Sequence, residues 1–213
     1  MHVKKSATIV LLLTVCLLSS VLAQTPQPAT NTLTPEEREA ALKLFQTTHD
    51  NFIKSISGLS QKQWSFKPAP DRWSVAEVAE HITVAETTIM GLIRHPLMQS
   101  PAAPEKREQV KGKDEIIVQR VPDRSHKVQA PEILRPTGRW ATEADLTKAF
   151  EDARKANMEY IRTTNDDLRD HFFDHPVFGT LDGYQWLLLI GTHSARHTAQ
   201  IEEVKADPNF PKE

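Results

Sequence analysis

The sequence of 213 residues has a single cysteine, Cys16, and only seven glycines. Because Cys16 lies in an apolar N-terminal run, the chain that follows has no thiol for a disulfide, for catalysis or for metal ligation. No Gly-rich phosphate-binding loop and no C-x-x-C-H haem-attachment motif is present. A surplus of basic residues is also missing, since 26 Lys and Arg face 28 Asp and Glu. The chain therefore lacks the basic character of a nucleic-acid-binding protein, and we expect no nucleic-acid partner.

The first 23 residues have the three parts of a secretory signal peptide. Lys4 and Lys5 form a positive start, residues 7–18 are almost entirely apolar, and the sequence VLA at 21–23 supplies the small residues of a cleavage site. We expect cleavage after Ala23 and export to the periplasm or the extracellular space, with no stable membrane insertion afterwards. The apolar run is shorter than the about 20 residues of a membrane-spanning helix. A retained N-terminal anchor is the alternative.

Four later segments have the hydrophobic spacing of amphipathic helices, and each begins with a residue that caps helices well. The capping residues are Thr34, Ser74, Thr142 and Asp182. The helices are expected at 34–57, 74–93, 142–164 and 182–206. A flexible leader at 24–33 precedes them, and a C-terminal tail at 207–213 follows.

A long connection separates the second of these helices from the third. Residues 94–141 carry six prolines, and a connection of this length is usually a crossover or a functional segment. A short helix is expected within it, around 105–121. No segment alternates between apolar and polar residues for long enough to demand a sheet. The sequence predicts one all-α domain at 34–206, a four-helix bundle with a long crossover connection between helices two and three.

Two histidines stand four residues apart in the last helix. His193 and His197 continue the apolar stripe of Trp186 and Ile190, so both are expected to face the core. Imidazoles at this spacing lie about 6 Å apart on one helix face, where one divalent cation can bridge them. Gln200 shares that face and is a candidate partner for the site.

A third histidine is expected to face inward from the second helix. His81 lies within the apolar stripe formed by Val78, Ile82 and Ile89. Three inward imidazoles from two helices suit a divalent metal site with a coordination position left open, as in catalytic centres. The alternative is that each histidine only hydrogen-bonds a neighbour in the core.

Three further polar residues are weaker candidates. Glu77, one turn before His81, is a metal ligand or general base, unless the capping box that begins at Ser74 occupies its carboxylate. His49 lines the pocket or is a core histidine with its own partner. Asn157 reaches toward the metal cavity or bonds across the bundle. His171 and His175 are expected on a surface loop because Pro176 and Gly179 interrupt that stretch.

Two motifs resemble the DinB/YfiT-like superfamily. They are DRWSVAEVAEHI at 71–82 and HSARHTAQI at 193–201. The resemblance covers essentially residues 34–206 and implies a four-helix bundle. It also implies a metal triad of His81, His193 and His197, occupied by zinc or nickel. Characterised relatives include thiol-dependent transferases and isomerases.

These observations together predict an exported metalloprotein. We expect a metal-dependent hydrolase that activates water on a small-molecule substrate, because hydrolysis needs no intracellular cofactor. The alternatives are a metal-dependent thiol S-transferase or isomerase, and a non-catalytic metal-binding stress-response protein. A homodimer is left open.

Overall fold

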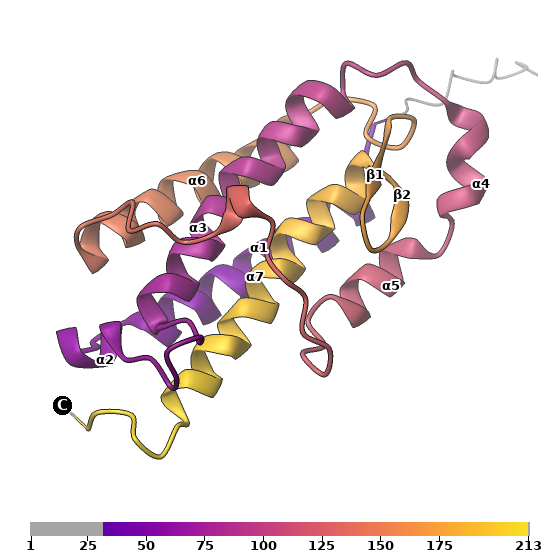
Figure 1. Cartoon of the computed structure of the whole chain (residues 1–213). Coiled ribbons are helices and arrows are strands. Elements are labelled where there is room, and N and C mark those ends of the chain that lie inside the picture. Colours follow the sequence, from indigo (N-terminus) through magenta and orange to yellow (C-terminus); the bar gives the residue numbers. More distant parts are fainter. Residues whose placement is uncertain (1–31, 213) are drawn as a thin grey trace, which may run out of the picture. The chain divides into compact units, whose positions relative to one another are not determined.

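A bundle of four long helices forms the centre of the protein. The computed structural model describes residues 32–212, in which these helices are α1 (Pro35–Ile56), α3 (Val75–Leu92), α6 (Glu143–Thr163) and α7 (Gly183–Lys205) (Figure 1). The predicted all-α four-helix bundle is confirmed. The predicted signal peptide and residues 24–31 of the leader lie outside the described residues.

Side chains at the helix starts explain where the long helices begin. In α1, α3 and α7 a capping box joins the capping residue to the third helical residue, which satisfies two otherwise free backbone N–H groups. At α6 the Thr142 side chain accepts a hydrogen bond from the Asp145 N–H. Each predicted helix start therefore agrees with the structure.

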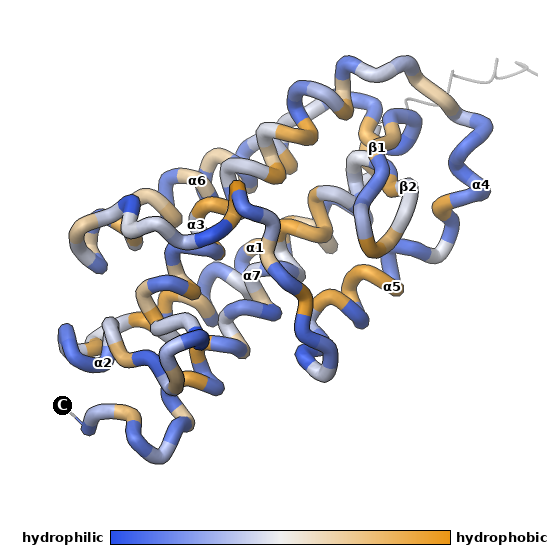
Figure 2. The backbone as a smooth tube through the Cα atoms, in the orientation of Figure 1, coloured by the Kyte–Doolittle hydropathy of each residue, from blue (hydrophilic) through white to orange (hydrophobic). Residues whose placement is uncertain are grey.

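The buried faces of the helices meet in two hydrophobic clusters. One cluster contains Phe45, Ile161 and the first half of α7. The other contains Phe52, Phe150 and Ile201. Hydrophilic and hydrophobic stretches alternate along the visible parts of the long helices in Figure 2, as expected for helices with one buried face. Within residues 32–212 no helix is both long enough and apolar enough to cross a membrane.

The connection between α3 and α6 is partly helical. It begins with a π-helical turn at Ile93–Leu97 and contains α4 (Arg107–Val110), α5 (Lys113–Arg120) and a short 3-10 turn at Glu132–Leu134. Gly112, with a φ of 78°, separates α4 from α5, so the single helix expected at 105–121 is in fact two. After α5 the chain crosses in front of α7 and returns to α3 before α6 begins (Figure 1).

The stretch expected to be a surface loop forms a β-hairpin instead. Strands β1 (Phe172–His175) and β2 (Gly179–Asp182) pair antiparallel, and Phe173 lies opposite Leu181. Strands of four residues are too short to show a clear alternation in the sequence. The hairpin leads directly into α7, and His175 contacts the ring of Trp186 at a centroid distance of 5.2 Å. His175 is therefore half-buried rather than on the free surface.

Gly183 is needed where the hairpin enters α7. Its N–H donates to the Leu168 carbonyl at 2.7 Å, and a Cβ at this position would lie 2.9 Å from that oxygen. We expect Gly183→Ala to lower the free energy of unfolding by about 1–3 kcal/mol, the usual cost of overpacking. Urea denaturation measures this. Gly91→Ala is the control, because an added Cβ in α3 meets nothing within 4 Å; equal stability of the two variants would contradict the prediction.

Candidate metal centre

Three histidine side chains meet between α3 and α7. His81 is buried, at 2% exposure, and faces α7, while His193 and His197 are half-buried on successive turns of that helix. The Nε2 atom of His81 lies 3.1 Å from Nε2 of His193 and 3.2 Å from Nε2 of His197. One ligand nitrogen from each residue lies within 4.8 Å of the other two. The structure thus brings together all three histidines singled out in the sequence.

The spacing of these nitrogens fits a single divalent cation. Zinc binds imidazole nitrogen at about 2.0–2.1 Å, so two nitrogens on one ion at 90–109° lie about 2.8–3.4 Å apart. The separations of 3.1 and 3.2 Å fall in this range. The donor set is also suitable, because neutral imidazole is a good ligand for zinc and nickel.

Hydrogen bonds at Nδ1 determine which nitrogen faces the centre. His81 Nδ1 lies 2.8 Å from the Leu134 carbonyl oxygen, and His197 Nδ1 lies 2.7 Å from Gln200 Oε1. Both oxygens are acceptors, so Nδ1 carries the proton in each neutral ring and Nε2 carries a lone pair. Two lone pairs that face each other at 3.2 Å repel unless a cation lies between them. The local tautomers therefore favour metal binding.

The environment keeps all three imidazoles neutral. Burial lowers the pKa of His81, and burial together with the charges of His197 and His81 lowers the pKa of His193 well below its usual value. Burial, followed by the charge of His81, lowers the pKa of His197 to about 3. Neutral histidine is the form that ligates a metal, and in His81 and His197 the remaining proton lies on Nδ1, so no proton has to be displaced from their Nε2 atoms at pH 7.

The lowered pKa values predict acid lability of the metal-free protein. Unfolded histidine titrates near pH 6.5, above the folded pKa values, so the unfolded chain binds more protons. Stability is then fully present above pH 6.5 and falls as the pH drops toward about 3, the folded pKa of His197. The slope is up to about 1.4 kcal/mol per pH unit for each histidine. Thermal unfolding at pH 7.0 and 5.5 tests this. Burial raises the pKa of Asp182 to about 6, so this carboxyl opposes the change within the window, but one carboxyl is outweighed by three histidines. An unchanged melting temperature would be the contrary result.

Gln200 has the position expected of it. Its Oε1 accepts from His197 and also from Arg124 Nη1, at 3.3 Å, and Arg124 binds Glu203 through its Nη2 at 2.8 Å. Arg124 comes from the connection between α5 and α6, so this segment is linked to the histidine cluster through Gln200.

The weaker candidates are occupied elsewhere. Glu77 completes the capping box of α3 by accepting from the Ser74 N–H at 2.8 Å, and it also binds Lys67 at 3.0 Å. Its carboxylate is therefore engaged as a cap, the alternative role considered for it. Asn157 bonds across the bundle to the Glu86 carboxylate at 3.0 Å. His49 bonds Asp50 at 2.9 Å and stacks on a phenylalanine of α6, so it has partners of its own.

Sequence reasoning marked the connection as a crossover or functional segment but missed two contacts that help form the centre. Leu134 contributes through its backbone carbonyl, which gives no signal in a sequence. Trp73, just before α3, lies 5.0 Å from the His81 ring between centroids and covers it. The tryptophan was visible in the sequence only as a residue next to the helix cap.

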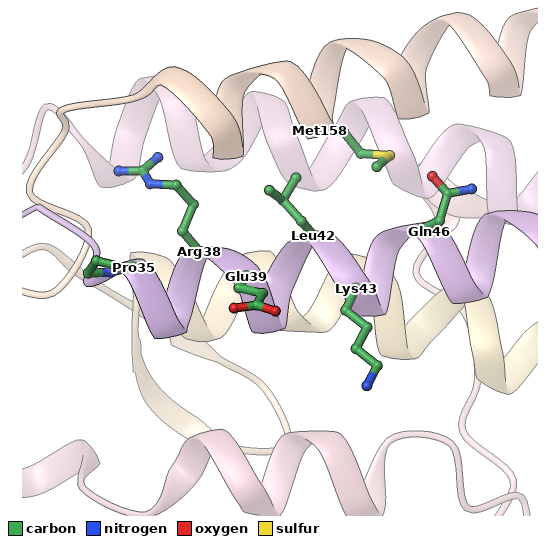
Figure 3. A pocket seen from close by; sticks show the side chains of 7 residues that line it. All are labelled: Pro35, Arg38, Glu39, Leu42, Lys43, Gln46 and Met158. Atoms are coloured by element: carbon green, nitrogen blue, oxygen red, sulfur yellow. The ribbon is translucent and has the colours of Figure 1, made fainter.

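A shallow pocket elsewhere on the bundle has no relation to the histidines. It lies between α1 and α6, and its lining residues in Figure 3 include Arg38, Leu42 and Met158. Arg38 Nη2 donates to the Thr164 carbonyl at 3.1 Å and Nη1 donates to that of Ile161. These bonds satisfy carbonyls at the C-terminal end of α6, which is a structural role.

Comparisons with known proteins agree with this fold. The profile of the DinB superfamily matches residues 44–201. The uncharacterized protein YuaE of Bacillus subtilis (strain 168) is 25% identical over 164 residues, which cover 77% of this chain and 96% of YuaE. The solved structure of YfiT from Bacillus subtilis, described as a probable metal-dependent hydrolase with an unusual four-helix bundle topology, matches with a TM-score of 0.53 at 11% identity. That match covers 88% of this chain and 94% of YfiT and supports the fold.

Proposed function

The chain belongs to the DinB superfamily, and we propose that it is a metal-dependent hydrolase whose divalent cation is held by His81, His193 and His197. The observation that carries the proposal is the convergence of three Nε2 atoms from two helices at 3.1 and 3.2 Å. Zinc or nickel is the proposed ion, because imidazole suits both and the spacing fits.

A divalent cation held by His81, His193 and His197 would supply Lewis acidity, which would lower the pKa of water toward neutrality and polarise a substrate oxygen. Two hydrogen-bond acceptors of the protein prepare the imidazoles for metal binding. Leu134 and Gln200 hold the Nδ1 protons of His81 and His197, which keeps both rings oriented and their Nε2 atoms free. His81, His193 and His197 are neutral, so they would not compensate the charge of a bound ion, which would remain available to a substrate.

Hydrolysis is proposed over transfer to a thiol for two reasons. The expected export would place the protein away from intracellular thiol cofactors, whereas water is present everywhere. The description of YfiT as a probable metal-dependent hydrolase points to the same class. A small molecule is the proposed substrate.

The test combines a probe of the open coordination position with a substrate screen. Protein loaded with Co²⁺ is titrated with a small anion such as azide, and a change in the visible spectrum is expected if a coordination position is open. Zn²⁺- and Ni²⁺-loaded protein is then screened against esters, amides and phosphoesters, with and without a low-molecular-weight thiol. Turnover without thiol supports the hydrolase. Turnover that needs thiol would show a transferase, and an azide-insensitive spectrum with no turnover would show a non-catalytic metal protein.

A further inference from the structure

The residue before His81 ties the α5–α6 connection to α3. The Glu80 side chain is buried, at 5% exposure for the residue, and accepts from the backbone N–H groups of Thr137 at 2.7 Å and Gly138 at 2.8 Å. Arg139 Nη1 donates to the same carboxylate at 3.3 Å. A buried carboxylate is costly without such donors, so these bonds hold the loop and the helix together.

The loop held by Glu80 carries the carbonyl that orients His81. Arg139 donates to the carbonyls of Arg135 at 3.3 Å and Ile133 at 3.4 Å, on either side of Leu134. The Leu134 carbonyl accepts from His81 Nδ1 at 2.8 Å. Glu80, the loop and His81 therefore form one closed chain of contacts that begins and ends on the same turn of α3.

We propose that Glu80 is a positioning residue for the metal centre: it holds residues 133–139 so that the Leu134 carbonyl fixes His81 with its proton on Nδ1. Because Nε2 of His81 then keeps its lone pair, it can bind a metal ion together with His193 and His197. If the loop is released, His81 can take the other tautomer, with a proton on Nε2 that blocks ligation. The effect on metal affinity rests on the proposed function, whereas the effect on the tautomer does not.

Glu80→Gln is the direct test, because it keeps the size of the side chain but removes the charge and one acceptor oxygen. Partners that orient a ligand in this way typically change metal affinity by about 10–100-fold, and a loss of this size is expected for Zn²⁺ measured by chelator competition. Glu77→Gln is the matched control. It makes the same change one turn earlier in α3, and Gln still completes a capping box, so wild-type affinity is expected.

A second measurement uses the metal-free protein and needs no activity. Nitrogen-15 NMR of the histidine rings distinguishes Nδ1–H from Nε2–H, and hydrogen exchange reports on the Thr137 and Gly138 amides. In wild type and Glu77→Gln, His81 is expected as the Nδ1–H tautomer with both amides protected. In Glu80→Gln we expect mixed tautomers and faster exchange at both amides.

The outcomes separate this proposal from the proposed function. Wild-type affinity, tautomer and protection in Glu80→Gln would overturn the positioning role. A wild-type protein without Zn²⁺ affinity would overturn the metal function, and the NMR result would still decide whether Glu80 sets the His81 tautomer. If Glu80→Gln does not fold, Gly138→Ala replaces it. Gly138 has a φ of 77°, which disfavours alanine, and no atom lies within 4 Å of an added Cβ, so this substitution disturbs only the loop. An unchanged His81 tautomer in Gly138→Ala would count against the proposal.

Discussion

His193→Ala is expected to lower the affinity for Zn²⁺ or Ni²⁺ by about 1000-fold or more, which corresponds to about 4 kcal/mol. His193 Nε2 lies 3.1 Å from that of His81, so the variant leaves two of the three converging nitrogens. Two imidazoles and solvent hold a divalent cation far less tightly than three. Competition with a chelator of known affinity measures the loss, and any hydrolase activity should fall with it.

His95→Ala is the control for this loss. His95 is an exposed histidine in the turn that follows α3, so the variant removes an imidazole without touching the cluster. We expect it to retain wild-type affinity. If His193→Ala also kept its metal, the ion would have to be bound somewhere other than the three-histidine cluster.

Arg154→Met is expected to lower the free energy of unfolding by about 3–5 kcal/mol, the usual cost of leaving one partner of a buried ion pair without the other. Arg154 and Glu86 are each 1% exposed, and their side chains form two hydrogen bonds across α3 and α6, one of them 3.1 Å long. Arg154 Nη1 also donates to the Phe45 carbonyl at 2.6 Å and to Thr48 Oγ1 at 2.7 Å. The substitution leaves the Glu86 carboxylate buried without its cation. Chemical denaturation of the metal-free protein measures the change.

Two further variants decide whether the loss comes from the unpaired charge. Arg162→Met removes an arginine of the same helix whose ion pair with Glu159 is exposed, so a change within about 1 kcal/mol is expected. Replacing both members of the buried pair, Glu86→Leu with Arg154→Met, removes both charges and should recover much of the stability. A double variant no more stable than Arg154→Met would show that packing, and not the unpaired charge, is responsible.

Much of the fold and of the candidate site could be predicted from local patterns. The capping residues Thr34, Ser74, Thr142 and Asp182 mark helix starts because their side chains bond backbone groups three residues away, a contact that sequence spacing alone determines. The inward direction of His81 and His193 followed from helical periodicity, although the residues are 112 positions apart.

The features that were missed depend on tertiary contacts. Arg154 reads as a surface residue of an amphipathic helix, and its burial depends on acceptors from two other helices, the Glu86 carboxylate of α3 and the Phe45 carbonyl and Thr48 hydroxyl of α1. The anchoring of the connection by Glu80 uses backbone N–H groups, which every sequence has. The hairpin before α7 is too short to show a period; a turn at residues 176–178 joins its strands, and His175 of the first strand packs on Trp186 of α7.

The central claim is that His81, His193 and His197 hold one divalent cation. Elemental analysis of purified protein, stripped of metal and reloaded with a single ion, measures it most directly. We predict about one Zn²⁺ or Ni²⁺ per chain for wild type, and none above background for His81→Ala or His193→Ala. Wild-type protein without bound metal, or equal occupancy in wild type and both variants, would contradict it.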